Sequence, residues 1–396
     1  MKSLVVIGLL AVVGSAAIWA QKGTKDAPNK GNNGEKPANT QRQSVTRTLV
    51  VPDSISVAVE KGARWLASVQ GADGGWGQDG GEPSYVRRDV ALETTGNDVA
   101  NTAIAALALL RAGDKYRPNV ERALEFILKR VEASPAEGLA ITNAQSQQTQ
   151  VERKLGNYID TFVASMLLGE VDGTLSKPLS ARVHSALQKC VAKIEQNQMK
   201  DGSWNVGGGW APLLGTSLAS RSLYIASQKG IAVDKEVQAR TDAFTQKNQT
   251  DAANPGKGGG TGAFGRGMAE SVTVTSGAAG VTLYQDAQAL EQLSRTPESR
   301  KENAKEIAAI NSKLSDTRFV EGYGSIGGEE FFSYLNISDG LKRSGGKAWT
   351  EWNSKITEKI LKLQNEDGTW AGHHCITGRC AVTSAAILNL TADYVN

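Results

Sequence analysis

The sequence predicts an all-α protein whose folded part is an α6/α6 toroid, a barrel of six outer and six inner helices. Three observations lead to this prediction. A motif of Gln, Gly and Trp occurs three times in closely similar form, and weaker copies stand between the strong ones. Amphipathic segments also alternate with segments that are apolar almost all round. A repeat that holds two helical segments is typical of a helical array in which neighbouring repeats bury one another.

The composition limits the classes of function. The 396 residues are 40% hydrophobic and 21% charged, which is enough apolar material for a large core. The formal net charge is +3, and no basic run marks a nucleic-acid site. The 3 cysteines allow at most one intrachain disulfide. We therefore expect a folded protein that does not bind nucleic acid and is not built on a disulfide framework.

The first 50 residues have the composition of a targeting segment followed by a linker. Lys2 precedes an apolar run that reaches Ala20, which is the pattern of a secretory signal peptide over residues 1–20. An uncleaved membrane anchor is the alternative, because the run is at the short limit of a spanning helix. Residues 21–50 are polar, which favours a disordered linker. We expect an exported protein, periplasmic or secreted, whose toroid covers residues 51–396.

The three strong copies each place a turn after an amphipathic helix. Their Gln-to-Trp segments read QGADGGW, QMKDGSW and QNEDGTW. An apolar stripe of helical period precedes each Gln, and the Asp-Gly pair is typical of a turn. The indoles are therefore expected to pack inside the repeat. The structural residues of these Gln-Trp repeats are Gln70, Trp76, Gln198, Trp204, Gln364 and Trp370.

Three weaker copies have their anchors at Val131, Gln249 and Leu314. The six anchors are roughly 50 to 67 residues apart, which leaves room for two helices in each repeat. The first segment of each repeat has one charged face, so it should lie outside. The second segments are apolar almost all round and should form the inner helices. These predicted inner helices cover about residues 97–113, 157–169, 216–230, 278–293, 329–340 and 381–390.

On these residues the chain resembles the squalene and oxidosqualene cyclases, whose QW repeats match the strong copies. The six-pair layout is similar to the toroid that those cyclases share with protein prenyltransferase β subunits. The resemblance covers roughly residues 54–396. It implies that each Gln and its aromatic residue tie an outer helix to the start of the next helix, with the Gln amide on free N–H groups there. It implies less about activity, because the repeat is structural.

Three motifs of related proteins do not occur in the sequence. They are the Asp-x-Asp-Asp acid motif of class II cyclases, the Asp-Asp-x-x-Asp motif of class I terpene synthases and the Cys-Gly-Glu-Gln thioester run. Ordinary cyclase chemistry is therefore disfavoured. The Gly-rich stretch at residues 255–267 lacks the spacing of a phosphate-binding loop, and we interpret it as a flexible insertion.

The loops that lead into the inner helices should meet at one end of the toroid, where their polar residues could share a pocket. The last of these loops contains GHHCITGRC. Because imidazole and thiolate are good zinc ligands, His373, His374 and Cys375 could hold zinc. A disulfide between Cys375 and Cys380, a packed loop with free thiols, and a Cys375 nucleophile activated by His374 are the alternatives.

Carboxylates and aromatic residues from the other loops complete the set of candidates. Asp98 and Asp160 stand near inner-helix N-termini, where helix capping explains them as well as catalysis does. Asp160 or Glu330 could also complete a zinc site. The catalytic candidates are His374, Cys375, Asp98 and Asp160. The residues expected to line a ligand cavity are Trp210, Tyr158, Tyr284, Glu330 and Tyr334.

Two hypotheses for function follow from these candidates. In the first, the protein is an exported repeat protein, similar to prenyltransferases and squalene cyclases, that binds an isoprenoid, another lipid or a protein partner in or on the toroid. In the second, it is a divergent terpenoid cyclase or a metal-dependent prenyl transferase, with zinc as the cofactor. The sequence leaves the oligomeric state open.

Overall fold

The computed structural model describes residues 52–78, 96–142, 149–204, 212–253, 281–321 and 326–394. The predicted signal peptide, the predicted linker, Trp210 and the Gly-rich stretch lie outside these residues. The described part is almost entirely helical, and its strands are confined to one pair. None of its helices is both long enough and apolar enough to cross a membrane.

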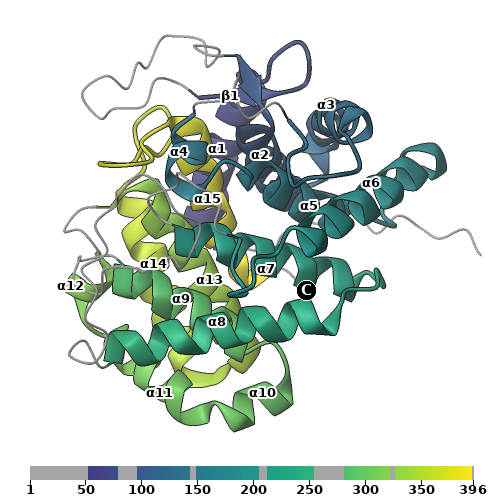
Figure 1. The fold of residues 1–396 in the computed structure, drawn as a ribbon. Coiled ribbons are helices and arrows are strands. Elements are labelled where there is room, and N and C mark those ends of the chain that lie inside the picture. Colours follow the sequence, from purple (N-terminus) through teal and green to yellow (C-terminus); the bar gives the residue numbers. More distant parts are fainter. Residues whose placement is uncertain are drawn as a thin grey trace, which may run out of the picture. The chain divides into compact units, whose positions relative to one another are not determined.

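An inner ring of six helices can be followed through the described residues (Figure 1). Each inner helix packs against the next one along the chain, and the last packs against the first, so that the ring is closed. Nearly every residue of these helices that the sequence shows as apolar is buried. The inner helices are α2 (Val99–Ala112), α5 (Ile159–Val171), α7 (Pro212–Gln228), α9 (Val281–Leu293), α13 (Gly328–Ser344) and α15 (Arg379–Leu390).

The outer helices pack around this ring and bury one face each. α1 contacts both α15 and α2, α6 contacts both α5 and α7, and α14 contacts both α13 and α15. The outer helices are α1 (Asp53–Ser68), α3 (Arg117–Ala133), α6 (Lys177–Gln196), α8 (Lys235–Ala253), α11 (Ala304–Lys313) and α14 (Gly346–Lys362). The predicted α6/α6 toroid is therefore confirmed.

Several short elements between these helices were not predicted. Strands β1 (Trp76–Gly77) and β2 (Asn97–Asp98) pair antiparallel, with Trp76 opposite Asp98. Helix α4 (Gln150–Leu155) precedes α5, and the remaining short helices are α10 (Pro297–Glu302) and α12 (Thr317–Val320). Two 3-10 turns, η2 (Asp114–Tyr116) and η3 (Ala392–Tyr394), follow α2 and α15. Of these elements, α4 matters most for the site.

The three Gln-Trp repeats make the same contacts in the structure. In each repeat the indole Nε1–H donates to a carbonyl of the preceding outer helix, and the Gln amide donates to the carbonyl of the turn glycine. These contacts hold each turn against the outer helix that precedes it. The indole bonds are Trp76 to Leu66 (2.8 Å), Trp204 to Ile194 (2.7 Å) and Trp370 to Ile360 (2.7 Å). The amide bonds are Gln70 to Gly74 (2.8 Å), Gln198 to Gly202 (3.0 Å) and Gln364 to Gly368 (2.9 Å).

The same Gln amides also reach the next outer helix, but not in the way the resemblance implies. Their amide nitrogens donate to main-chain carbonyls. The amide oxygens of Gln70 and Gln198 accept from side chains of that helix, Asn119 and Arg240, and not from free main-chain N–H groups. Gln364 donates to Ala58 of α1 at 2.9 Å, and thereby joins the last repeat to the first. The two other bonds are Gln70 to Asn119 (2.9 Å) and Gln198 to Val237 (2.9 Å).

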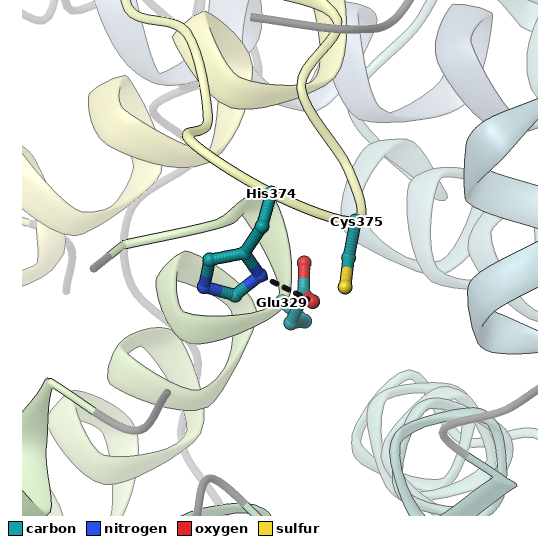
Figure 2. Close-up of side chains that lie close together, drawn as sticks. All are labelled: Glu329, His374 and Cys375. Carbon is teal, nitrogen blue, oxygen red and sulfur yellow. Dashed lines mark ion pairs between the residues drawn. The ribbon is translucent and has the colours of Figure 1, made fainter. Parts of the chain in front are cut away.

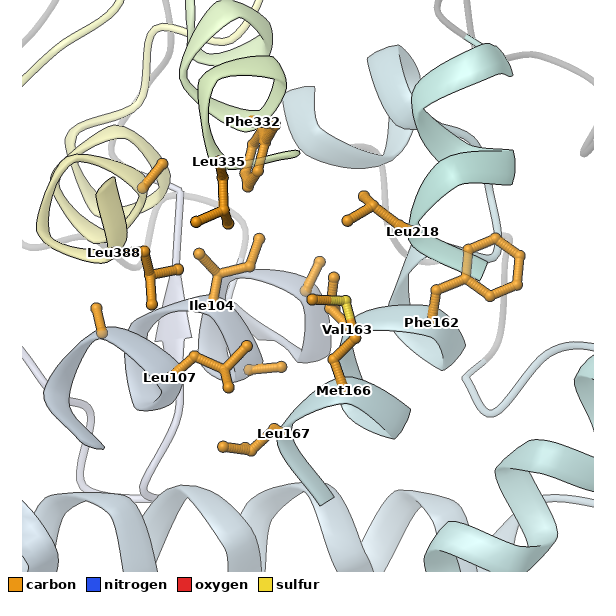
Figure 3. Close-up of a cluster of buried hydrophobic side chains, with 14 of the residues drawn as sticks. Ile104, Leu107, Phe162, Val163, Met166, Leu167, Leu218, Phe332, Leu335 and Leu388 are labelled. Atoms are coloured by element: carbon orange, nitrogen blue, oxygen red, sulfur yellow. The ribbon is translucent and has the colours of Figure 1, made fainter. Parts of the chain in front are cut away.

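Apolar side chains fill the middle of the inner ring. Figure 3 shows Ile104 and Leu107 of α2, Met166 of α5, and Leu335 of α13 pointing toward one interior. They belong to one continuous core that includes residues of most inner and outer helices. Because this core occupies the middle, the two ends of the ring are separate places at which a ligand could bind.

Candidate functional site

The loop at residues 371–378 is held tightly against the start of α13. The main-chain N–H of Gly328 donates to the carbonyl of Ile376 at 2.8 Å. A Cβ atom at Gly327 would lie 2.6 Å from the carbonyl oxygen of His374, so only glycine permits this approach. The fixed loop places its side chains directly over the first turn of α13.

Glu329, His374 and Cys375 form a compact group, which we call the His374 site. One carboxylate oxygen, one ring nitrogen and the sulfur lie within 4.8 Å of one another. The Nδ1 atom of His374 is 3.3 Å from Oε1 of Glu329. Successive side chains of an extended chain point to opposite sides. Cys375, however, has a φ of +56°, in the left-handed region, and Figure 2 shows its thiol and the imidazole facing the same carboxylate.

Glu330 and Tyr284 lie next to the His374 site, on the side of the imidazole that faces away from Glu329. The Oε2 atom of Glu330 is 3.7 Å from Nε2 of His374. Glu330 also accepts a hydrogen bond of 2.9 Å from the hydroxyl of Tyr284 and one of 2.8 Å from the N–H of Gly327. Burial and the neighbouring charge of Glu329 raise the pKa of Glu330 to about 7. The imidazole thus lies between two buried carboxyl groups.

The cysteines are all free thiols, so the structure does not contain the disulfide between Cys375 and Cys380. Cys380 is buried in α15, whereas Cys375 is only partly buried. Burial raises the pKa of the Cys375 thiol above its usual value. A thiol in this state becomes a thiolate when a cation binds to it.

Two other candidates lie away from this group. His373, which the sequence analysis placed in the zinc set, has an exposed side chain and does not belong to the three-residue cluster. Tyr334 is fully buried; its hydroxyl donates to the carbonyl of Val320 at 2.7 Å, and its ring lies edge-on to Trp352 at 5.8 Å. The side chain of Tyr334 is therefore packed against α14.

Asp98 and Asp160 belong to a second group of buried carboxyl groups, which includes Glu152 of α4. Asp98 caps α2 as predicted, since it accepts from the main-chain N–H of Asn101 at 2.8 Å. Burial raises the pKa of Asp98 to about 6 and that of Glu152 to about 7. The pKa of Asp160 lies well above its usual value, because it is buried beside these two carboxyl groups. We call Asp98, Glu152 and Asp160 the acid cluster.

Helix α4 connects the acid cluster with the His374 site. Glu152 is on one side of this helix, and Gln150 at its start accepts hydrogen bonds from the N–H groups of Thr377 (3.0 Å) and Gly378 (3.3 Å). Asp98 and Tyr158 also line one cavity of about 760 Å³. Both groups therefore lie where the inner helices begin, which is the end of the toroid that the sequence predicted for the site.

The sequence predicted Glu330 as a cavity residue and as a possible zinc ligand, but it did not predict Glu329 as the partner of His374, and it did not predict α4. The signal for Glu329 was weak. It is one of two adjacent glutamates, and the pattern of α13 does not decide which of them faces the loop.

Comparisons with known proteins agree with the fold. A profile of the squalene-hopene cyclase C-terminal domain matches residues 44–138. The squalene-hopene cyclase of Bradyrhizobium diazoefficiens is 40% identical over 70 residues, which are 18% of this chain and 10% of that enzyme. An apo structure of the type II terpene cyclase MstE from Scytonema superposes with a TM-score of 0.50 at 11% identity, over 86% of this chain and 96% of that one.

These matches agree with the class of fold: the chain is an α/α toroid, and its first repeat is similar in sequence to squalene-hopene cyclases. The sequence match covers the first Gln-Trp repeat. The structural match covers 86% of the chain, and at 11% identity it shows the fold alone. The chain matches only about a tenth of the length of its curated relative.

Proposed function

We propose that this protein is a metal-dependent enzyme that binds an isoprenoid or a similar apolar small molecule where the inner helices begin. In this proposal Glu329, His374 and Cys375 hold a zinc ion. The observation that carries the proposal is the convergence of carboxylate oxygen, imidazole nitrogen and sulfur within 4.8 Å. Thiolate, imidazole and carboxylate are together the donors that zinc takes in proteins.

The charges and hydrogen bonds of these residues fit a cation. Glu329 is fully buried; its Oε1 atom accepts no hydrogen bond from the described residues and lies 3.3 Å from Nδ1 of His374, which carries a positive charge only when the imidazole is protonated. A buried carboxylate oxygen in that state is costly unless a cation neutralises it. Glu330, which accepts a hydrogen bond from the Tyr284 hydroxyl, lies 3.7 Å from Nε2 of His374, on the side from which a carboxylate can orient a ligating imidazole. Three protein ligands are the number found in catalytic zinc sites, where the fourth position is left for water or substrate.

The substrate class is proposed from the family. The curated relative is named for squalene, and the matched segment includes the first repeat of the toroid. Because the chain lacks the Asp-x-Asp-Asp acid, a bound metal would supply the electrophile that this motif supplies elsewhere. We therefore propose squalene or a prenyl diphosphate as the first substrates to try. In the non-catalytic alternative, the toroid binds such a lipid or a protein partner without turning it over.

The test is the metal content of the purified full-length chain, measured by elemental analysis. We expect about one zinc per chain in the wild type, and strong loss in Cys375→Ser and in Glu329→Gln. His373→Ala is the matched control, since this exposed neighbour should leave the zinc content unchanged. Zinc absent from the wild type, or retained in Cys375→Ser, would overturn the metal site.

Turnover separates the enzyme from the binding protein. The full-length chain is incubated with squalene or geranylgeranyl diphosphate, and products are followed by mass spectrometry before and after treatment with a chelator. Product formation that is lost with the chelator supports the enzyme. Saturable binding of either lipid without product would instead favour the non-catalytic alternative.

We also propose export through residues 1–20. The apolar run behind Lys2 supports this proposal. Fractionation of the native host, followed by N-terminal sequencing of the purified protein, tests it. A protein recovered from the cytoplasm with an intact N-terminus would contradict it.

A further inference from the structure

A second cavity of about 560 Å³ lies at the other end of the inner ring. Its walls come from residues near the C-terminal ends of the inner helices, such as Arg111 of α2, Glu170 of α5 and Gln228 of α7. The His374 site and the acid cluster lie at the N-terminal ends of the same helices. The lining residues of the second cavity all belong to the part of the chain that the structure describes.

The rim of this cavity is basic. Five basic and two acidic side chains line it, which leaves an excess of three positive charges. The acidic ones are already engaged: Glu170 pairs with Arg111 at 3.3 Å, and Asp339 pairs with Arg221. Arg343 shares the buried Glu291 with a neighbouring arginine and is 2.9 Å from it. The positive excess is thus not removed by the carboxylates around it.

Helix dipoles account for only part of this charge. The inner helices end here, and the negative ends of helices favour cations in their last turn, as for Arg111 and Lys342. Arg221 is different, because it lies in the middle of α7, more than a turn from its end. It is only 7% exposed, yet it lines the cavity, where it also donates to Asn336 at 3.1 Å. A buried, oriented guanidinium of this kind is suited to an anionic group.

The floor of the cavity is apolar. Leu107, Met166, Leu335 and Leu388 all line it, and they come from four different inner helices. Figure 3 shows these four side chains gathered around the same interior. The cavity therefore has an apolar inner surface below a cationic rim.

We propose that this second cavity binds a single-chain amphiphile with an anionic headgroup, such as an alkyl phosphate or a fatty carboxylate. The headgroup contacts Arg221, Arg343 and the lysines of the rim, and the chain lies on the four apolar side chains. The volume is within the range of sites for small ligands. This proposal does not depend on the metal or on catalysis at the His374 site.

The experiment is calorimetric titration of the full-length chain with octyl phosphate below its micelle concentration. Octyl glucoside and octyltrimethylammonium have the same chain with a neutral and a cationic head, and inorganic phosphate has the head alone. We expect one octyl phosphate per chain, with affinity at least about tenfold above that of each of the other probes. Equal binding of octyl glucoside would overturn the proposal, because the basic rim would then have no role.

Substitutions at the cavity rim show whether octyl phosphate binds in the second cavity. The double variant Lys229→Gln/Lys342→Gln removes two positive charges from the rim and should weaken octyl phosphate binding about tenfold or more. Lys362→Gln, an exposed lysine of α14 outside the cavity, is the control and should bind as the wild type does. Cys375→Ser should also bind normally, since its change is at the other end of the ring. A double variant that melts like the wild type and keeps full affinity would overturn the proposal.

Discussion

Replacement of Gln364 by alanine tests whether the Gln-Trp repeats close the toroid. The side chain donates two hydrogen bonds of 2.9 Å, one to Gly368 in its own turn and one to Ala58 in α1. A net hydrogen bond contributes about 1 kcal/mol, and a buried carbonyl left without its donor costs at least as much. We therefore expect Gln364→Ala to lower the free energy of unfolding by about 2 kcal/mol, measured by urea denaturation.

The helices that lose hydrogen-exchange protection distinguish a loss of ring closure from a general loss of stability. Native-state hydrogen exchange of Gln364→Ala should show reduced protection in α1 and α14, the two outer helices that this residue joins. Gln198→Ala is the comparison variant, because Gln198 makes the same two bonds, together with two more to Thr241 and Arg240, and joins α6 to α8. Its loss of protection should appear in those helices. A loss below about 0.5 kcal/mol for Gln364→Ala, or the same exchange pattern in both variants, would refute the reasoning.

Three further predictions concern stability. Glu291 pairs with two arginines, which lower its pKa to about 2. The charged carboxylate therefore contributes about 3 kcal/mol to the free energy of unfolding above pH 4.5, and this contribution is lost as the pH falls toward 2. Acid titration of the wild type and of Glu291→Gln checks this prediction. Glu152 has its pKa raised to about 7, so the folded state gains stability as the pH falls from about 8 to 5. Glu152→Gln should therefore be about 2 kcal/mol more stable than the wild type at pH 8, a difference that thermal melts should show shrinking as the pH falls through 7 and vanishing only below the ordinary glutamate pKa of 4.5. Gly202→Ala should cost at least about 2 kcal/mol in urea denaturation, because φ is +89° and a Cβ would lie 2.1 Å from a carbonyl of α8; a wild-type midpoint would contradict this.

The fold could be predicted from the sequence because the repeat encodes it locally. Gln, Asp-Gly and Trp recur at fixed spacing, and each of them makes its contacts within its own turn or with the adjacent outer helix. The six inner helices follow from apolar segments that have no charged face. The capping role of Asp98 could also be predicted, since a carboxylate directly before an apolar helix is a strong local signal.

The candidate site could be predicted only in part. The loop with His374 and Cys375 was found because its residue types are unusual, but its partner Glu329 is 45 positions earlier in the chain. The left-handed φ of Cys375 brings the side chains of His374 and Cys375 to one side of the loop. The sequence does not predict this conformation, because glycine is the residue that usually adopts it. Helix α4 is six residues long, too short for its periodicity to be read. These features depend on tertiary contacts and not on local sequence.

The most direct test of the proposed metal site is the absorption spectrum of the protein loaded with Co²⁺. Cobalt substitutes for zinc in tetrahedral sites, and its bond to a thiolate gives a charge-transfer band in the near ultraviolet. We predict this band in the wild type and in His373→Ala, and its absence in Cys375→Ser, because only Cys375 among the three site residues supplies sulfur. No band in the wild type, or a band that persists in Cys375→Ser, would contradict the account.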